Sequence, residues 1–110
     1  MRYEKFRQSR QAAVKLEIAL EEFFLEQTPE KARKDYGDYL RLRIRPAVEA
    51  LIAREDVEHL QALEDLGWIP HGQLDVFLRT AAELRKNAAL VWLLGLKQAA
   101  VGFPGEDFSL

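Results

Sequence analysis

Apolar residues recur at intervals of three and four along most of the chain, the spacing that places them on one face of an α-helix. In the first such segment, residues 2–27, they are Phe6, Ala13, Leu16, Leu20 and Phe23. Leucine and alanine outnumber valine, isoleucine and threonine, and no segment alternates with the period of two that is typical of a strand. The pattern therefore predicts an all-α protein.

Prolines and glycines mark the expected helix boundaries. Thr28 is a good N-cap and Pro29 suits the first helical position, so a second helix should begin there after a loop of a residue or two. A loop that short makes the first two helices an antiparallel hairpin. Pro46 either kinks the second helix or opens a third, and a new helix at Pro46 is the favoured interpretation. The expected helices, five or six in number, span about residues 2–27, 29–45, 46–54, 57–66, 72–86 and 88–101.

A weak internal repeat relates two of these helices. The segment 56–63 is echoed by 87–94, an offset of 31 residues, and such a period is typical of helical-hairpin solenoids. The stretch Asp56 to Gly67 resembles the turn and second helix of an ankyrin repeat. Pro46 stands near the position of that family's proline, and Ala81 and Ala82 stand near its paired alanines. The likeness covers about residues 46–96.

The likeness to ankyrin repeats carries an expectation about architecture and role. It implies stacked antiparallel helical hairpins, an ankyrin-like or short α-solenoid fold, acting as a binding module without an active site. The chain departs from the family, because the Thr-Pro-Leu-His opening and the usual turn glycines are absent. No ligand residue is carried over, since ankyrin repeats bind through variable surface positions. One helical domain is expected over residues 1–102, followed by an extended tail over 103–110.

Composition and charge limit the possible functions. The chain has no cysteine, which excludes disulfides, thiolate zinc sites, iron–sulfur clusters and cysteine nucleophiles. Its formal net charge of −2 is too small to steer it toward nucleic acid or anionic lipid. No apolar run approaches the roughly 18 residues of a membrane span. A cytoplasmic protein is expected, with no cofactor, no metal, no small-molecule ligand and no membrane or nucleic-acid partner.

The two histidines, His59 and His71, are the only candidates for chemistry. Glu55 and His59 could share a helix face, but a metal site needs a third ligand that the sequence does not supply. The spacing of Arg54 and His59 resembles the signature of the HEPN ribonucleases, small all-helical proteins whose arginine and histidine act on RNA. That resemblance gives an alternative function, a ribonuclease using both residues. Asp56, used as a helix cap, would instead place them on different helices.

From Ala88 to Leu96 every residue is apolar or glycine, so the last expected helix has no polar side to present to water. Either the tail covers it through Phe103 and Phe108, or it binds a protein partner or a second copy of the chain. A non-enzymatic interaction or scaffold domain is the leading hypothesis, with a dimer that Trp92→Lys would weaken. The expected binding residues are Arg54, Glu58, Trp68, Arg85 and Trp92.

Overall fold

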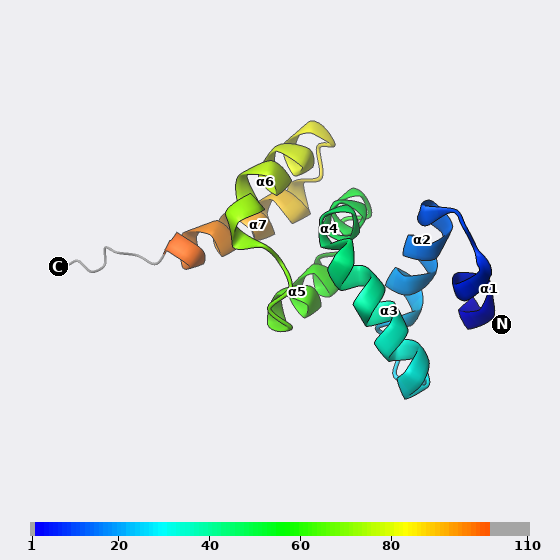
Figure 1. The fold of residues 1–110 in the computed structure, drawn as a ribbon. Coiled ribbons are helices and arrows are strands. Elements are labelled where there is room, and N and C mark those ends of the chain that lie inside the picture. The colour runs from blue at the N-terminus through cyan, green and yellow to red at the C-terminus, as the bar shows by residue number, and fades with distance from the viewer. Residues whose placement is uncertain (1, 102–110) are drawn as a thin grey trace. The chain divides into compact units, whose positions relative to one another are not determined.

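The computed structural model of the chain describes residues 2–101. Over that range the backbone forms seven α-helices and one short 3-10 helix, and no β-strand (Figure 1). The elements are α1 Arg2–Gln8, α2 Ala12–Glu22, α3 Glu30–Leu42, α4 Ile44–Ala53, α5 Val57–Asp65, η1 His71–Gln73, α6 Leu74–Glu83 and α7 Asn87–Val101. The prediction of an all-α protein is confirmed, whereas the number of helices in this range exceeds the five or six expected.

The helices fall into two compact units, an N-terminal unit over Met1–Ala47 and a C-terminal unit over Val48–Leu110. In the N-terminal unit, α2 packs against both α1 and α3. The buried apolar residues of this unit are Phe6, Ile18, Ala19, Leu20, Ala32, Tyr36, Leu40 and Ala47. The expected single domain over 1–102 stays a prediction, and the expected tail over 103–110 lies outside the described residues.

The first expected helix is interrupted, which accounts for the additional element. The chain leaves the helical conformation at Ser9, where the serine hydroxyl accepts a hydrogen bond from the Gln11 amide at 3.1 Å. Serine side chains compete in this way with the helical hydrogen bonds of the backbone. The interruption lets α1 fold back onto α2. As a result the buried Phe6 packs edge-on against Tyr36, with ring centroids 4.9 Å apart.

The connection between α2 and α3 also differs from the expectation. It spans residues 23–29 instead of a residue or two, and Pro29 occupies the N-cap position of α3 without a side-chain cap. Thr28 is not the N-cap, because its hydroxyl points backwards and donates to the Glu22 carbonyl at 2.6 Å. The Arg33 guanidinium donates to two further carbonyls of the loop, at 2.7 and 2.9 Å. These donors satisfy the carbonyls that α2 leaves unpaired at its C-terminus.

The helix expected to open near Pro46 is confirmed, beginning two residues earlier as α4. Pro46 therefore lies in the first turn, where a missing N–H costs no helical hydrogen bond. In the C-terminal unit, α7 packs against both α6 and α5. The core of this unit consists of the buried residues Val48, Leu51, Ile52, Leu60, Leu63, Ile69, Leu74, Phe77, Ala81, Ala89 and Leu93.

Candidate binding surface

Two turns of the C-terminal unit share one backbone geometry. In the α4–α5 turn Glu55 has φ 52°, and in the α6–α7 turn Arg85 has φ 57°. The amide after each of them donates to a carbonyl five residues back, Asp56 to Leu51 and Lys86 to Ala81, both at 2.9 Å. This is the Schellman arrangement, in which a left-handed residue ends a helix and satisfies its last carbonyls. Residues with a Cβ are strained in that conformation.

The side chain of Glu55 joins these two turns. Its Oε2 accepts a hydrogen bond from the Ala88 amide at 2.9 Å, across 33 residues of sequence. Ala88 is the second residue of α7, where amides have no partner within the helix. Glu55 is therefore an N-cap for α7 that comes from another turn, and its negative charge favours the helix N-terminus. The turns around Arg54 and Arg85, both expected to contribute to binding, are held side by side by this bond.

Asp56 and His59 form a local pair at the start of α5. The Asp56 carboxylate accepts from the His59 amide at 3.2 Å and lies 2.7 Å from the imidazole Nδ1. Asp56 is thus the N-cap of α5, as the sequence predicts. Arg54 follows the end of α4 while His59 lies in the first turn of α5, so the two residues of the alternative ribonuclease site are on different helices.

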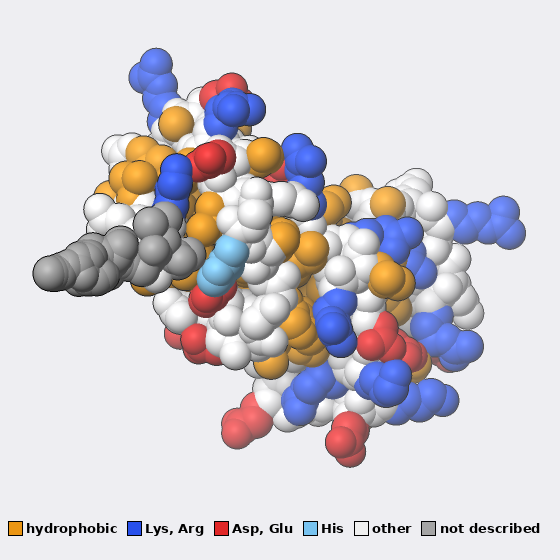
Figure 2. Space-filling view, turned by 60° about the vertical axis from the view of Figure 1, so that its left-hand side comes forward, with side chains coloured by type: hydrophobic (Ala, Val, Ile, Leu, Met, Phe, Trp, Pro, Cys, Tyr) orange, Lys and Arg blue, Asp and Glu red, His pale blue; other side chains and the backbone are white. Residues whose placement is uncertain are grey.

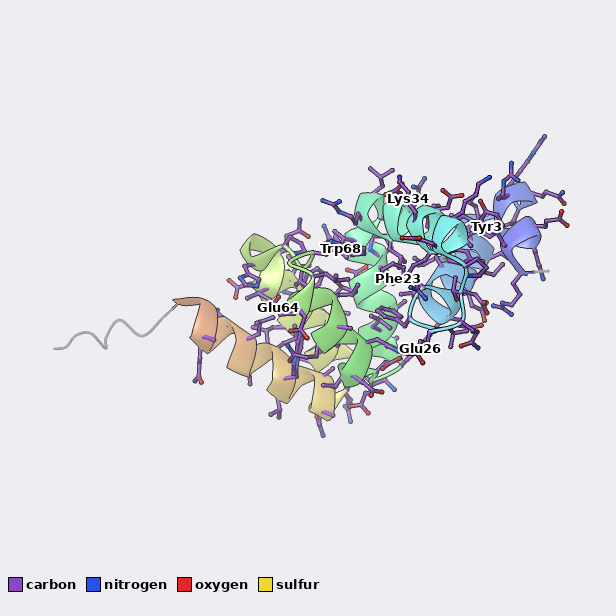
Figure 3. All side chains as sticks on the ribbon, turned by 90° about the horizontal axis from the view of Figure 1, so that it is seen from below. Tyr3, Phe23, Glu26, Lys34, Glu64 and Trp68 are labelled. Atoms are coloured by element: carbon purple, nitrogen blue, oxygen red, sulfur yellow. The ribbon has the colours of Figure 1, made fainter. Side chains whose placement is uncertain are left out.

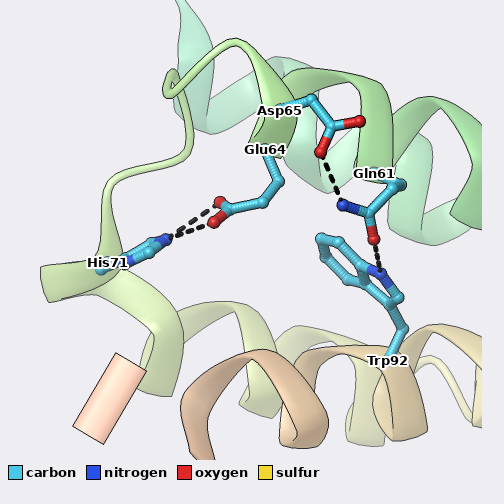
Figure 4. A network of polar contacts seen from close by, with 5 residues as sticks. All are labelled: Gln61, Glu64, Asp65, His71 and Trp92. Carbon is cyan, nitrogen blue, oxygen red and sulfur yellow. Dashed lines mark hydrogen bonds and ion pairs between the residues drawn. The ribbon is translucent and has the colours of Figure 1, made fainter. Parts of the chain in front are cut away.

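A polar network connects α5 with α7 and η1 (Figure 4). The indole Nε1 of Trp92 donates to Gln61 Oε1 at 2.9 Å, and the amide nitrogen of Gln61 donates to Asp65 at 2.9 Å. On the same side of α5, both carboxylate oxygens of Glu64 lie 2.9–3.0 Å from the Nε2 of His71. Trp92, expected to be a binding residue, is half-buried and fastens α7 to α5.

An ion pair connects α7 with α6 near its C-terminal half. Lys97 Nζ lies 2.5 Å from Asp75 Oδ1. The hydrogen bond and the charge of Lys97 together lower the pKa of the Asp75 carboxyl below its usual value. Glu55, Gln61 and Lys97 therefore attach α7 to three different elements or turns, which fixes the rotation of α7 about its axis.

That rotation leaves a strip of apolar side chains of α7 in solvent. Ala89 and Leu93 are fully buried, whereas Val91 is 68% exposed and Leu94 is 46% exposed. Ala88 and Gly95 are exposed next to them, and no atom lies within 4 Å of the position that a Cβ on Gly95 would occupy. We call Ala88, Val91, Leu94 and Gly95 the α7 strip. Hydrophobic side chains also reach the surface elsewhere on the face drawn in Figure 2, between groups of charged side chains.

The remaining expected binding residues lie at the edges of these features. Glu58 is exposed in the first turn of α5, and Arg85 is exposed in the α6–α7 turn. Trp68 is half-buried and directly follows Gly67, whose φ of 76° ends α5. Sequence reasoning missed Glu55 as a cap and Gln61 as the partner of Trp92. No local signal could have revealed either contact, because the partners are 33 and 31 residues away.

Two further features of the described chain bear on possible sites. Among residues 2–101, no group of three or more histidine, aspartate or glutamate side chains could hold a metal ion. Over the same part of the chain, no helix combines the length and apolar character that a membrane crossing requires. In comparisons with known proteins, no protein-family model, curated protein or solved structure matches this chain.

Proposed function

We propose that this chain is a non-enzymatic interaction domain that pairs with a second copy of itself through the α7 strip. One observation carries the proposal: Val91 and Leu94 are 68% and 46% exposed on a helix that carries no charged residue from Asn87 to Leu96. Contiguous exposed apolar surface of this kind is typical of protein-interaction sites. Neighbouring Trp92 contributes by fixing the orientation of α7, because its indole is bonded to Gln61.

The chemistry of the strip favours a second copy over a different partner. Around a two-fold axis each residue meets residues of the same strip, so a charged strip would repel itself and an uncharged strip would not. Gly95 and Ala88 lack large side chains, which allows the backbones of two helices to approach closely. The strip occupies part of a helix about 22 Å long, much less than a standard interface of about 800 Å2 per partner provides. We therefore expect weak, concentration-dependent association.

The test measures the mass of the full chain in solution over a wide range of concentration by light scattering. We expect a mass that rises toward twice the chain mass, and we expect Val91→Lys and Leu94→Lys to return it to the monomer value. Leu66→Lys is the matched control, because Leu66 is 49% exposed but lies at the end of α5. Its mass curve should coincide with that of the unchanged chain.

Two outcomes would contradict the proposal. A chain that stays monomeric at every concentration would exclude self-association, and the same chain with a tail resistant to proteolysis would favour coverage of α7 by residues 102–110. A dimer that survives Val91→Lys and Leu94→Lys equally well would place the interface on another surface. Circular dichroism of each variant checks that the helices remain folded.

A further inference from the structure

The N-terminal unit contains a pocket of about 330 Å3 that none of the preceding features uses. It lies between the start of α1, the end of α2 and the first turns of α3, and its residues are Arg2, Tyr3, Glu22, Thr28, Pro29, Lys31, Ala32 and Tyr36. Figure 3 shows Tyr3 where α1 meets α3. Known ligand pockets range from about 300 to 1,000 Å3 and combine a mostly apolar wall with a few convergent polar groups. This pocket has the size for a small ligand.

The deepest polar group of the pocket is the hydroxyl of Tyr36. Tyr36 is only 1% exposed, and its ring is fixed edge-on between Tyr3 and Phe6, at centroid distances of 5.9 and 4.9 Å. No described residue forms a hydrogen bond with its hydroxyl, although buried polar groups normally have a partner. Burial, assisted by the Glu22 carboxylate, raises the pKa of Tyr36. The hydroxyl is therefore protonated at neutral pH and available to donate.

The surroundings of this hydroxyl favour a negative charge. Side chains of a helix point toward its N-terminus, and the first turn of α3 at Lys31 and Ala32 also lines the pocket. That turn has no side-chain cap, so its amides and the positive end of the 13-residue helix remain available to an anion. Lys31 adds a positive charge that no described residue pairs.

The other ionisable groups at the pocket already have partners. The Glu22 carboxylate lies 3.2 Å from Arg2 Nε, and Arg2 also contacts Glu21 at 2.6 Å. The Tyr3 hydroxyl donates to the carboxylate of Asp35. Arg2 thus offsets the charge of Glu22, which leaves Lys31, the helix N-terminus and Tyr36 to set the preference of the pocket.

We propose that this pocket binds a small carboxylic acid with a compact aromatic or branched aliphatic body, whose carboxylate accepts from the Tyr36 hydroxyl and the first-turn amides of α3. The apolar body lies against Ala32, Pro29 and the ring of Tyr3, where its burial removes apolar surface from water. Lys31 supplies a charge at the entrance. The site is independent of the α7 strip and of the proposed self-association.

The experiment follows amide shifts of the full chain by NMR while phenylacetate is added. We expect saturable shifts at Lys31, Ala32 and Tyr36. Tyr36→Phe should weaken binding about tenfold, because a hydrogen bond to a charged group is lost while the ring is kept. Lys31→Gln should weaken it about threefold, because an exposed charge contributes less.

Matched controls separate this site from nonspecific binding. Lys34 is one turn further along α3 and is paired with Asp38 at 3.0 Å, on the outer side of the helix in Figure 3. Lys34→Gln should leave the affinity for phenylacetate unchanged. Inorganic phosphate and benzyl alcohol test the charge and the apolar body separately, and each should bind at least tenfold more weakly than phenylacetate. Absence of saturable shifts would overturn the proposal. So would equal affinity in Tyr36→Phe and the unchanged chain, or phosphate binding as tightly as phenylacetate.

Discussion

Glu55 and Arg85 allow one prediction to be worked out in detail, because they share a backbone geometry and differ in what their side chains do. Both occupy the left-handed region, with φ 52° and 57°, where a residue with a Cβ costs roughly 1 kcal/mol. Glu55 also caps α7 through the Ala88 amide at 2.9 Å. Arg85 is exposed, and no hydrogen bond or ion pair of its side chain involves a described residue.

Glycine at these two positions should therefore give different results. Arg85→Gly relieves the strain and loses no contact, so it should raise the free energy of unfolding by about 1 kcal/mol. Glu55→Gly relieves the same strain but removes a cap worth about 1 kcal/mol, so the two effects should cancel. Glu55→Ala keeps the strain and loses the cap, and it should lower the free energy of unfolding by about 1 kcal/mol.

Urea denaturation followed by far-ultraviolet circular dichroism measures these differences, with each 1 kcal/mol shifting the midpoint by roughly 0.5 M. The expected order of stability is Arg85→Gly above the unchanged chain and Glu55→Gly, with Glu55→Ala lowest. Glu55→Gln is the control, because its amide oxygen still accepts from Ala88 and it should lie between the last two levels. Equal stabilisation by glycine at both positions would refute the capping role of Glu55.

Three further predictions concern α7 and its neighbours. Leu93→Ala should lower the free energy of unfolding by about 3 kcal/mol, since Leu93 is fully buried, whereas Leu94→Ala should lower it by less than about 1 kcal/mol; urea denaturation checks both. Lys97→Gln should raise the lowered pKa of Asp75 to its usual range in an NMR titration. The pair stabilises the folded chain above the usual aspartate pKa and loses this effect as the pH falls through the lowered value, so Lys97→Gln should flatten that part of the pH–stability curve. Gly67→Ala should cost about 1 kcal/mol of thermal stability, because its φ of 76° strains any Cβ even though the surrounding space is open.

Much of the helical pattern could be predicted from the sequence because its signals are local. Apolar spacing and the cap at Asp56 identified α5, and Pro46 correctly indicated the start of α4 within two residues. The interruption at Ser9 was missed, because the apolar spacing continues through it. Thr28 was assigned to the wrong helix end, since a threonine hydroxyl can donate to the helix before it as readily as accept from the helix after it.

The candidate surface was predictable only in part. The absence of polar residues between Ala88 and Leu96 showed that α7 needed cover on more than one side. It could not show which side remains open, because a uniformly apolar helix has no moment to orient it. The orientation depends on Glu55, Gln61 and Lys97, whose partners lie 22 to 33 residues away. The pocket at Tyr36 was missed for a similar reason, because it joins the chain's first residues to α3.

The helix ends at Glu55, Gly67 and Arg85 have a consequence for how the chain acquires its structure. Each reverses or redirects the backbone with hydrogen bonds to carbonyls of the helix just completed. Such bonds join residues close in sequence, and small helical proteins rich in local contacts fold within about microseconds to milliseconds. The hairpin of α4 and α5 can therefore close during synthesis, before the ribosome has released α6 and α7.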